Sequence, residues 1–196
     1  MRQILYLGLD PSRYEYVGEL THFPIIQTVP LLLEDVDVRD VTHLLFTSPT
    51  AVSYWPFSFD EKVLIAIGGG TAAKLNRPCL VAPHATQEGV VELLKSMDLS
   101  DAFILWPRST RSRVCLERYF EEKKVKARIV DLYETKTLPQ SQLPNLSMFD
   151  EIVFTSPSTV DAFFSLFNLI PGEIKLTPIG PVTAEKLASM RLLFLQ

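Results

Sequence analysis

The chain has 196 residues, of which 47% are hydrophobic, and it carries a net charge of −4. This length suits one large domain or two small ones, and the hydrophobic content is sufficient for well-filled cores. An acidic balance argues against nucleic acid as the main partner, because binding to phosphates needs a basic face. No apolar run approaches the roughly 18 residues of a membrane span, so no membrane partner is expected.

The cysteines and the N-terminus indicate a cytoplasmic protein. Cys79 and Cys115 lie in an apolar run and a helical pattern, which favours buried, reduced thiols over a disulfide or a nucleophile. The first apolar stretch is too short for a signal peptide and is broken by Asp10 and Pro11. We expect a monomer in the cytoplasm.

Short apolar runs bounded by turn residues predict strands along the chain. These runs are Ile4–Leu7, Ile25–Thr28, His43–Thr47, Val63–Ile67, Cys79–Ala82, Phe103–Trp106, Ala127–Val130, Glu151–Thr155, Ile174–Ile179 and Leu192–Leu195. Helix-start signals follow several of them, at Ser48-Pro49, Thr86–Gly89, Ser109 or Thr110, Ser156-Pro157 and Thr183–Leu187. Alternating strands and helices favour an α/β fold whose domains have parallel sheets of five strands, covered on both faces.

Several motifs occur twice. The sequence FTSPTAV at 46–52 returns as FTSPSTV at 154–160, and IGGGTAAKL at 67–75 returns as IGPVTAEKL at 179–187. A weaker pair joins ILYLGLDPSR at 4–13 to ILWPRSTRSR at 104–113. A period of about one hundred residues is too long for a solenoid and matches one small domain. The chain is therefore interpreted as two copies of one α/β unit, with a ligand bound between them.

The order of the repeats predicts that one domain is discontinuous. One copy runs without interruption over 35–130, and the other is assembled from 1–29 and 137–196. Segments 30–34 and 131–136 would then cross between the domains as adjacent strands. Two crossings make a hinge with fewer degrees of freedom than a single linker.

Both FTSP motifs place a serine where a strand ends and a helix begins. Ligands of open α/β sheets gather at the carboxyl ends of strands, and a helix N-terminus attracts carboxylate or phosphate. Ser48 and Ser156 therefore cap their helices, bind an anion, or do both. The glycine motifs at 67–71 and 179–183 form similar joints, but their spacing is not that of a dinucleotide site.

Other candidate residues are open to two interpretations. Tyr133 either faces the space between the domains or packs as an apolar side chain. Arg108, with Arg111 and Arg113, either lines a polyanion site or remains solvated surface charge. The histidines are scattered without ligand spacing, so no metal site is expected. No arrangement of serine, histidine and aspartate for nucleophilic catalysis is visible.

Taken together, the motifs resemble those of the uroporphyrinogen-III synthases. The match consists of FTSP opening a helix, IGxxTA in both halves, A-T-x-E-G before an apolar run at 85–94, and Y-E-T at 133–135. The resemblance covers nearly the whole chain and implies two flavodoxin-like parallel-sheet domains joined by a two-stranded linker. It also implies a lyase that cyclises hydroxymethylbilane, a linear tetrapyrrole, inverts the terminal pyrrole ring and releases water without cofactor or metal.

The resemblance also assigns roles to residues. Tyr133 matches the tyrosine that assists loss of the substrate hydroxyl. The hydroxyl positions at helix starts, which would hold acetate and propionate arms, are Ser48, Thr71, Ser156 and Thr183. Arg108 is a further candidate substrate contact. A non-catalytic two-domain binder of a small polyanion remains the alternative, because it would share the same fold.

Overall fold

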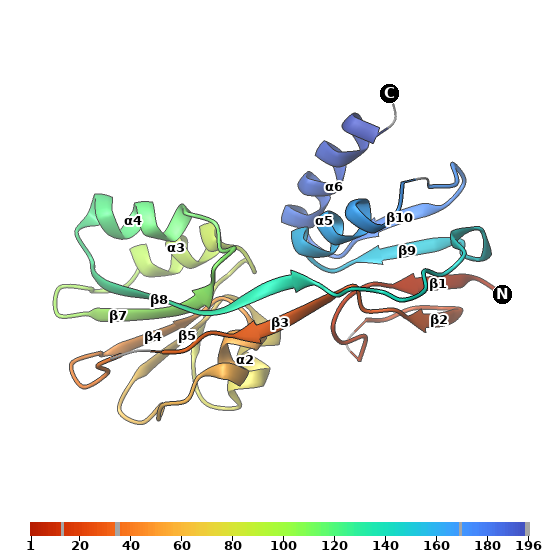
Figure 1. Cartoon of the computed structure of the whole chain (residues 1–196). Coiled ribbons are helices and arrows are strands. Elements are labelled where there is room, and N and C mark those ends of the chain that lie inside the picture. The colour runs from red at the N-terminus through yellow and green to blue at the C-terminus, as the bar shows by residue number, and fades with distance from the viewer. Residues whose placement is uncertain (13, 34–35, 169, 195–196) are drawn as a thin grey trace. The chain divides into compact units, whose positions relative to one another are not determined.

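The computed structural model describes residues 1–12, 14–33, 36–168 and 170–194 (Figure 1). The chain divides into two compact units. Met1–Gln27 and Thr135–Gln196 form the first, here called the discontinuous unit, and Thr28–Glu134 form the second, the continuous unit. The chain therefore passes from one unit to the other twice, within strands β3 and β8.

A six-stranded sheet forms the centre of the continuous unit, in the order β3-β8-β7-β4-β5-β6. Its strands are β3 (Ile26–Pro30), β4 (His43–Phe46), β5 (Val63–Ala66), β6 (Leu80–Val81), β7 (Phe103–Ser109) and β8 (Lys126–Thr137). Its helices are α1 (Pro49–Tyr54), α2 (Gly69–Leu75), α3 (Gln87–Lys95) and α4 (Cys115–Lys123). Backbone bonds from Leu31 to the Leu132 carbonyl and from Leu138 to the Ile25 carbonyl give β3 and β8 opposite directions.

The strands β4 to β8 are paired in parallel and confirm the predicted parallel α/β class. Numbered along the chain, their spatial order is third, second, first, fourth, fifth, whereas a flavodoxin sheet runs second, first, third, fourth, fifth. The flavodoxin-like detail is therefore not confirmed for this unit. The order reverses between β4 and β7, and such a switch point creates a ligand-binding crevice at the carboxyl ends of the strands.

Alternating side chains of the strands build two apolar layers in the continuous unit. Phe46 of β4 packs with Val52 of α1 on one face of the sheet. Leu45, one residue earlier, packs with Leu94 of α3 and Leu116 of α4 on the other face. Because successive strand residues point to opposite faces, a continuous apolar run was needed to bury both sides.

The discontinuous unit contains a parallel four-stranded sheet in the order β10-β9-β1-β2. Its elements are β1 (Gln3–Tyr6), β2 (Glu19–His22), the 3-10 helix η1 (Leu146–Met148), β9 (Glu151–Phe154), α5 (Pro157–Leu166), β10 (Lys175–Pro178) and α6 (Pro181–Phe194). Phe154 of β9 and Leu187 of α6 share one apolar cluster with Phe163 of α5. The order β10-β9-β1-β2 repeats β5-β4-β7-β8, so the sequence repeat has a counterpart in the topology.

The prediction of a strand at Leu192–Leu195 is wrong. Helix α6 continues through Phe194, and Leu195 lies outside the described residues. A short apolar run cannot be distinguished from a buried helix segment by periodicity alone, and no glycine or proline separates this run from Leu187. The two sheets have four and six strands instead of five each, because β3 joins the sheet of the continuous unit and the unpredicted β2 joins the other sheet.

Two further elements differ from expectation. Strand β2 was not predicted, because Glu19–His22 is an edge strand with mostly exposed polar residues. Strand β7 extends through Ser109, and α4 begins only at Cys115, after Ser109 and Thr110. The longer β7 places Ser109 in the sheet, where it contributes to the candidate site.

Candidate active site

Tyr133 lies on β8 and is buried, with 6% of its surface exposed. Its Oη is 2.8 Å from Oγ of Ser48, which follows β4. The ring of Tyr54 lies 5.8 Å from the Tyr133 ring between centroids, and the Tyr54 hydroxyl donates to the Thr28 carbonyl at 3.0 Å. The phenol is thus held among side chains of the continuous unit, next to the switch point of its sheet.

A β-bulge orients Tyr133 toward Ser48. Arg108 of β7 pairs with Asp131 of β8, but the next residue, Ser109, pairs with Tyr133, so Leu132 is an extra residue in β8. Without the bulge, Leu132 and Tyr133 would point to opposite faces of the sheet. Both instead belong to the same buried apolar cluster. The bulge therefore sets the direction in which the phenol points.

Ser48 combines two contacts. It is the N-cap of α1 with an extended backbone, Pro49 follows at the first helical position, and its Oγ accepts the N–H of Ala51 at 3.0 Å. The capping role predicted from the FTSP motif is confirmed. The same Oγ contacts Tyr133, so a residue that begins a helix also touches the candidate acid.

Burial raises the pKa of the Tyr133 phenol above its usual value of 10.0. Hydrogen bonds with Ser48, Thr50 and Ser109 act in the opposite direction, and the nearby Tyr54 phenol adds to the rise in pKa. A phenol with a raised pKa stays protonated at neutral pH. Tyr133 is therefore available as a proton donor.

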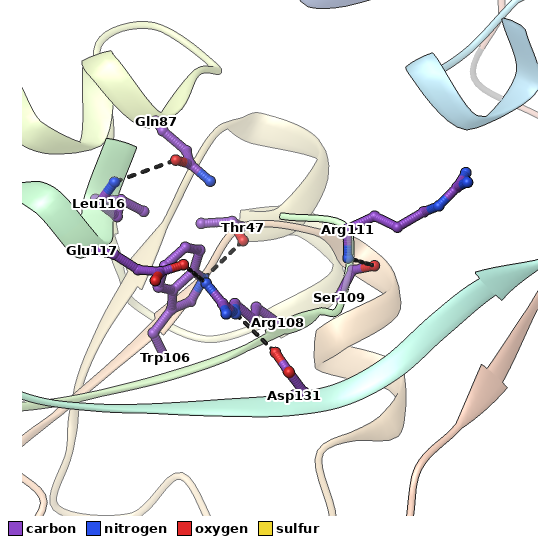
Figure 2. Close-up of polar contacts among 9 residues, drawn as sticks. All are labelled: Thr47, Gln87, Trp106, Arg108, Ser109, Arg111, Leu116, Glu117 and Asp131. Carbon is purple, nitrogen blue, oxygen red and sulfur yellow. Dashed lines mark hydrogen bonds and ion pairs between the residues drawn. The ribbon is translucent and has the colours of Figure 1, made fainter. Parts of the chain in front are cut away.

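The guanidinium of Arg108 lies between two carboxylates (Figure 2). It donates from Nε to Oδ1 of Asp131 at 2.8 Å and also bonds Glu117, while it stacks 5.0 Å above the Trp106 ring. Trp106 itself donates from Nε1 to Oγ1 of Thr47 at 3.0 Å. Two carboxylates already neutralise this cation, so Arg108 is not presented as an open anion site, and its contact with substrate stays a prediction.

The other two arginines of this segment do not join Arg108. Arg113 makes a two-pronged ion pair with Glu88 of α3 at 2.5 and 2.8 Å. The side chain of Arg111 points away from the Arg108 cluster in Figure 2. The three arginines therefore do not form the expected cluster.

The remaining predicted hydroxyls are distributed over both units. Thr71 and Thr183 lie in the first turns of α2 and α6 and are buried, with exposures of 2% and 4%. Ser156 is the partly buried N-cap of α5, followed by Pro157. Substrate contacts of these three residues stay predictions, and the burial of both threonines makes Ser156 the more accessible of them.

Sequence reasoning missed Thr50 and Ser109 as site residues. Thr50 stands in the first turn after the predicted cap, so the helix-start pattern contained its signal. Ser109 had been placed at a helix start, and only the register across the bulge brings it to Tyr133. A register shift of this kind has no signature in the local sequence.

Other site classes receive no support in the described part of the chain. Within it, no group of three or more His, Cys, Asp or Glu side chains could hold a metal ion. None of its helices is long and apolar enough to cross a membrane. Cys79 and Cys115 are free thiols, and both are partly buried instead of fully buried as expected.

The parallel sheets with their helices define the class, an α/β protein in which a buried tyrosine meets a helix-capping serine. The family described as uroporphyrinogen-III synthase HemD matches residues 14–192, and the chain belongs to this family. The fold is similar to that of uroporphyrinogen-III synthetase from Helicobacter pylori, with 18% identity, a TM-score of 0.66, and coverage of 97% of this chain and 89% of that one.

A mutant uroporphyrinogen III synthase from Thermus thermophilus is also similar. It has 16% identity and a TM-score of 0.59, with coverage of 96% of this chain and 89% of that one. No curated protein matches the chain. At such identities the two solved structures show a shared fold, and family membership rests on the match over 14–192.

Proposed function

We propose that the protein is a lyase that converts hydroxymethylbilane to uroporphyrinogen III with release of water. The family match over residues 14–192 supports this reaction. The observation that carries it to particular atoms is the 2.8 Å hydrogen bond between Tyr133 and Ser48 at the carboxyl end of the sheet. A buried, protonated phenol suits a reaction that begins with the departure of a hydroxyl group.

In the first step, Tyr133 donates its proton to the departing hydroxyl of hydroxymethylbilane. The carbon–oxygen bond breaks, water leaves, and the substrate becomes a resonance-stabilised azafulvene cation while Tyr133 becomes a phenolate. General acid help of this kind contributes about 10²–10⁴-fold in rate. The proton that the terminal pyrrole loses when that ring becomes aromatic again returns to the Tyr133 oxygen, so atoms and charge balance.

Inversion of the terminal ring depends mainly on how the protein positions the substrate. The terminal pyrrole attacks through its substituted carbon, and the resulting spiro intermediate fragments and closes again in the inverted orientation. The substrate supplies most of the reactivity, so the protein must mainly prevent direct closure to the symmetric isomer. We assign the holding of carboxylate arms to backbone N–H groups at helix starts, with Ser156 more accessible than the buried Thr71 and Thr183.

A non-catalytic binder of a polyanion is less well supported. Such a protein would use exposed cations that have no internal partner, but Arg108 bonds Glu117 and Asp131, and Arg113 bonds Glu88. A buried phenol among hydroxyls contributes little to the binding of an anion, because burial disfavours the nearby charge. The Tyr133 site therefore favours the enzyme.

The test is a coupled assay in which hydroxymethylbilane is generated in place and the porphyrin isomers are separated after oxidation. The wild-type protein is expected to give mainly isomer III, while a reaction without protein gives isomer I. The Tyr133→Phe variant serves as the matched control, because it keeps the aromatic ring and loses only the hydroxyl. Isomer I alone from the wild-type protein would reject the synthase reaction.

A further inference from the structure

Two serine hydroxyls approach Tyr133 from different elements. Ser48 precedes α1 and places its Oγ 2.8 Å from the phenol oxygen. Ser109 ends β7 and is paired with Tyr133 across the bulge, which brings its side chain beside the phenol, where it lowers the phenol pKa. The phenol oxygen is thus contacted from the β4–α1 joint and from the end of the neighbouring strand.

Each of these serine oxygens already accepts a backbone N–H. Ala51 donates to Ser48 Oγ at 3.0 Å, and Arg111 donates to Ser109 Oγ at 3.2 Å (Figure 2). A serine hydroxyl has one proton and two acceptor positions, so each serine still has a proton that it can donate to Tyr133. Linked hydrogen bonds strengthen one another, and a serine oxygen that accepts a backbone N–H becomes a better donor.

On the basis of the proposed function, we infer that Ser48 and Ser109 are positioning residues that both donate to Tyr133 Oη and stabilise the phenolate left after proton transfer. Because the serines donate, they leave the proton of the phenol directed at the departing hydroxyl of the substrate. Ser48 was predicted from the sequence to contact the substrate, whereas this inference assigns it the role of supporting the acid, Tyr133.

The residues around Tyr133 explain why neutral hydroxyl donors would stabilise its phenolate. Tyr133 is buried beside Leu132, and Tyr54 of α1 is the titratable group that its ring faces. Arg108 of the adjoining strand β7 is paired with Asp131 of β8, the strand that carries Tyr133, so the guanidinium is already neutralised. Burial raises the pKa of Tyr133, and the hydroxyl bonds are what lower it. Dipoles fixed in advance are an effective way to stabilise charge that develops during a reaction.

The first test needs no substrate. The protein is labelled with ¹³C at the tyrosine ring carbon that bears oxygen, and Tyr133 is assigned by comparison with Tyr133→Phe. The substitutions are Ser109→Ala and Ser48→Gly, since glycine still caps a helix well. Each is expected to raise the pKa of Tyr133 by about one pH unit, the size expected for a lost hydrogen bond to a charged oxygen.

Two controls separate the hydroxyl from the fold. Ser109→Thr and Ser48→Thr keep the hydroxyl and are expected to restore the wild-type titration. Ser53→Ala, on the same helix, removes a hydroxyl that bonds the Pro49 carbonyl and is expected to leave Tyr133 unchanged. If the pKa of Tyr133 stays at its wild-type value in both Ser109→Ala and Ser48→Gly, the inference is overturned.

The second test measures turnover in two backgrounds. Ser109→Ala is expected to reduce turnover by about tenfold when Tyr133 is present and by less than about twofold in Tyr133→Phe, because a positioning residue acts through its partner. Equal losses in both backgrounds would overturn the inference. The titration reports on the serine pair without substrate, whereas failure of the proposed function would be seen separately in the isomer analysis.

Discussion

The equivalent serines of the two FTSP motifs, Ser48 and Ser156, make different contacts. In the discontinuous unit, Ser156 Oγ accepts the N–H of Thr159 at 3.3 Å, and Thr159 Oγ1 accepts the N–H of Ser156 at 3.2 Å, which completes a capping box. In the continuous unit the same helical position is Ala51, which has no hydroxyl to return such a bond. Ser48 caps α1 and also reaches Tyr133. The repeated motif thus caps a helix in both copies, and in one of them its serine also contacts the candidate acid, Tyr133.

The neighbouring strands show the same asymmetry. Strand β2 has the place in its sheet that β8 has in the other, but β2 ends at His22, whose Nε2 lies 2.8 Å from the Gly8 carbonyl. Strand β8 carries the bulge that directs Tyr133 to Ser48. The repeated helix starts therefore do not define the candidate site by themselves, because Ser48 contacts a phenol whereas Ser156 bonds with Thr159.

The largest expected effect is the loss of the phenol. Tyr133→Phe should reduce turnover by roughly ten- to a thousand-fold, because the substrate still reacts slowly without acid help. The remaining product should be mainly isomer III, which isomer separation after oxidation would show. Tyr54→Phe removes a neighbouring hydroxyl that bonds Thr28 and should change turnover far less. Wild-type turnover in Tyr133→Phe would remove this residue from the mechanism.

The second-largest effect on turnover is expected from substitution of one of the two capping serines, which can be compared directly. Ser48→Ala and Ser156→Ala should each lower the free energy of unfolding by about 1 kcal/mol, the usual value of an N-cap. Ser48→Ala should in addition reduce turnover by about tenfold through Tyr133, whereas Ser156→Ala should cost less than about threefold, since backbone N–H groups share its contacts. Urea unfolding and the coupled assay measure the two quantities. Equal losses of turnover would contradict the difference between the joints.

The hydrogen bonds of the α5 capping box can be removed by a substitution at Thr159 that leaves Ser156 in place. Thr159→Val keeps the shape of a fully buried side chain but removes the acceptor for the N–H groups of Thr155 and Ser156. The free energy of unfolding should fall by about 1–3 kcal/mol, because buried donors are left unpaired. Urea unfolding measures it, with Ser158→Ala in the same turn as a control. A loss no greater than that of the control would mean that the box does not stabilise this joint.

The smallest effect is expected from an ion pair away from both joints. The Arg113 guanidinium lowers the pKa of Glu88 from 4.5 to about 2. Because the folded-state pKa is depressed, the stabilisation is full above about pH 4.5 and is lost as the pH falls toward 2. Glu88 is 58% exposed, so solvent screening should keep the contribution below about 1 kcal/mol.

The comparison of wild type with Glu88→Gln tests this pair. Their difference in free energy of unfolding should be present at pH 6 and should shrink as the pH approaches 2. Turnover of both proteins at neutral pH should be the same, because the pair lies outside the Tyr133 contacts. A difference in stability that grows on acidification would contradict the assigned direction.

Much of the fold could be predicted from local patterns. The apolar runs at His43–Thr47 and Glu151–Thr155 became β4 and β9 almost to the residue, since a strand buried on both faces must be continuously apolar. The serine-proline starts of α1 and α5 were equally legible. Prediction failed where local patterns were ambiguous, at the apolar end of α6 and at the polar edge strand β2.

The candidate site divides in the same way. The sequence by itself determined which residues could take part, because proline, serine and glycine mark helix starts and Tyr133 stands in a recognisable motif. Only the tertiary structure decided which of them meet. The bulge at Leu132 turns Tyr133 toward Ser48 and Ser109, Arg108 is bound by Glu117 and Asp131, and Thr71 is buried. These outcomes depend on strand register and on contacts between residues far apart in the chain, which local residue patterns do not encode.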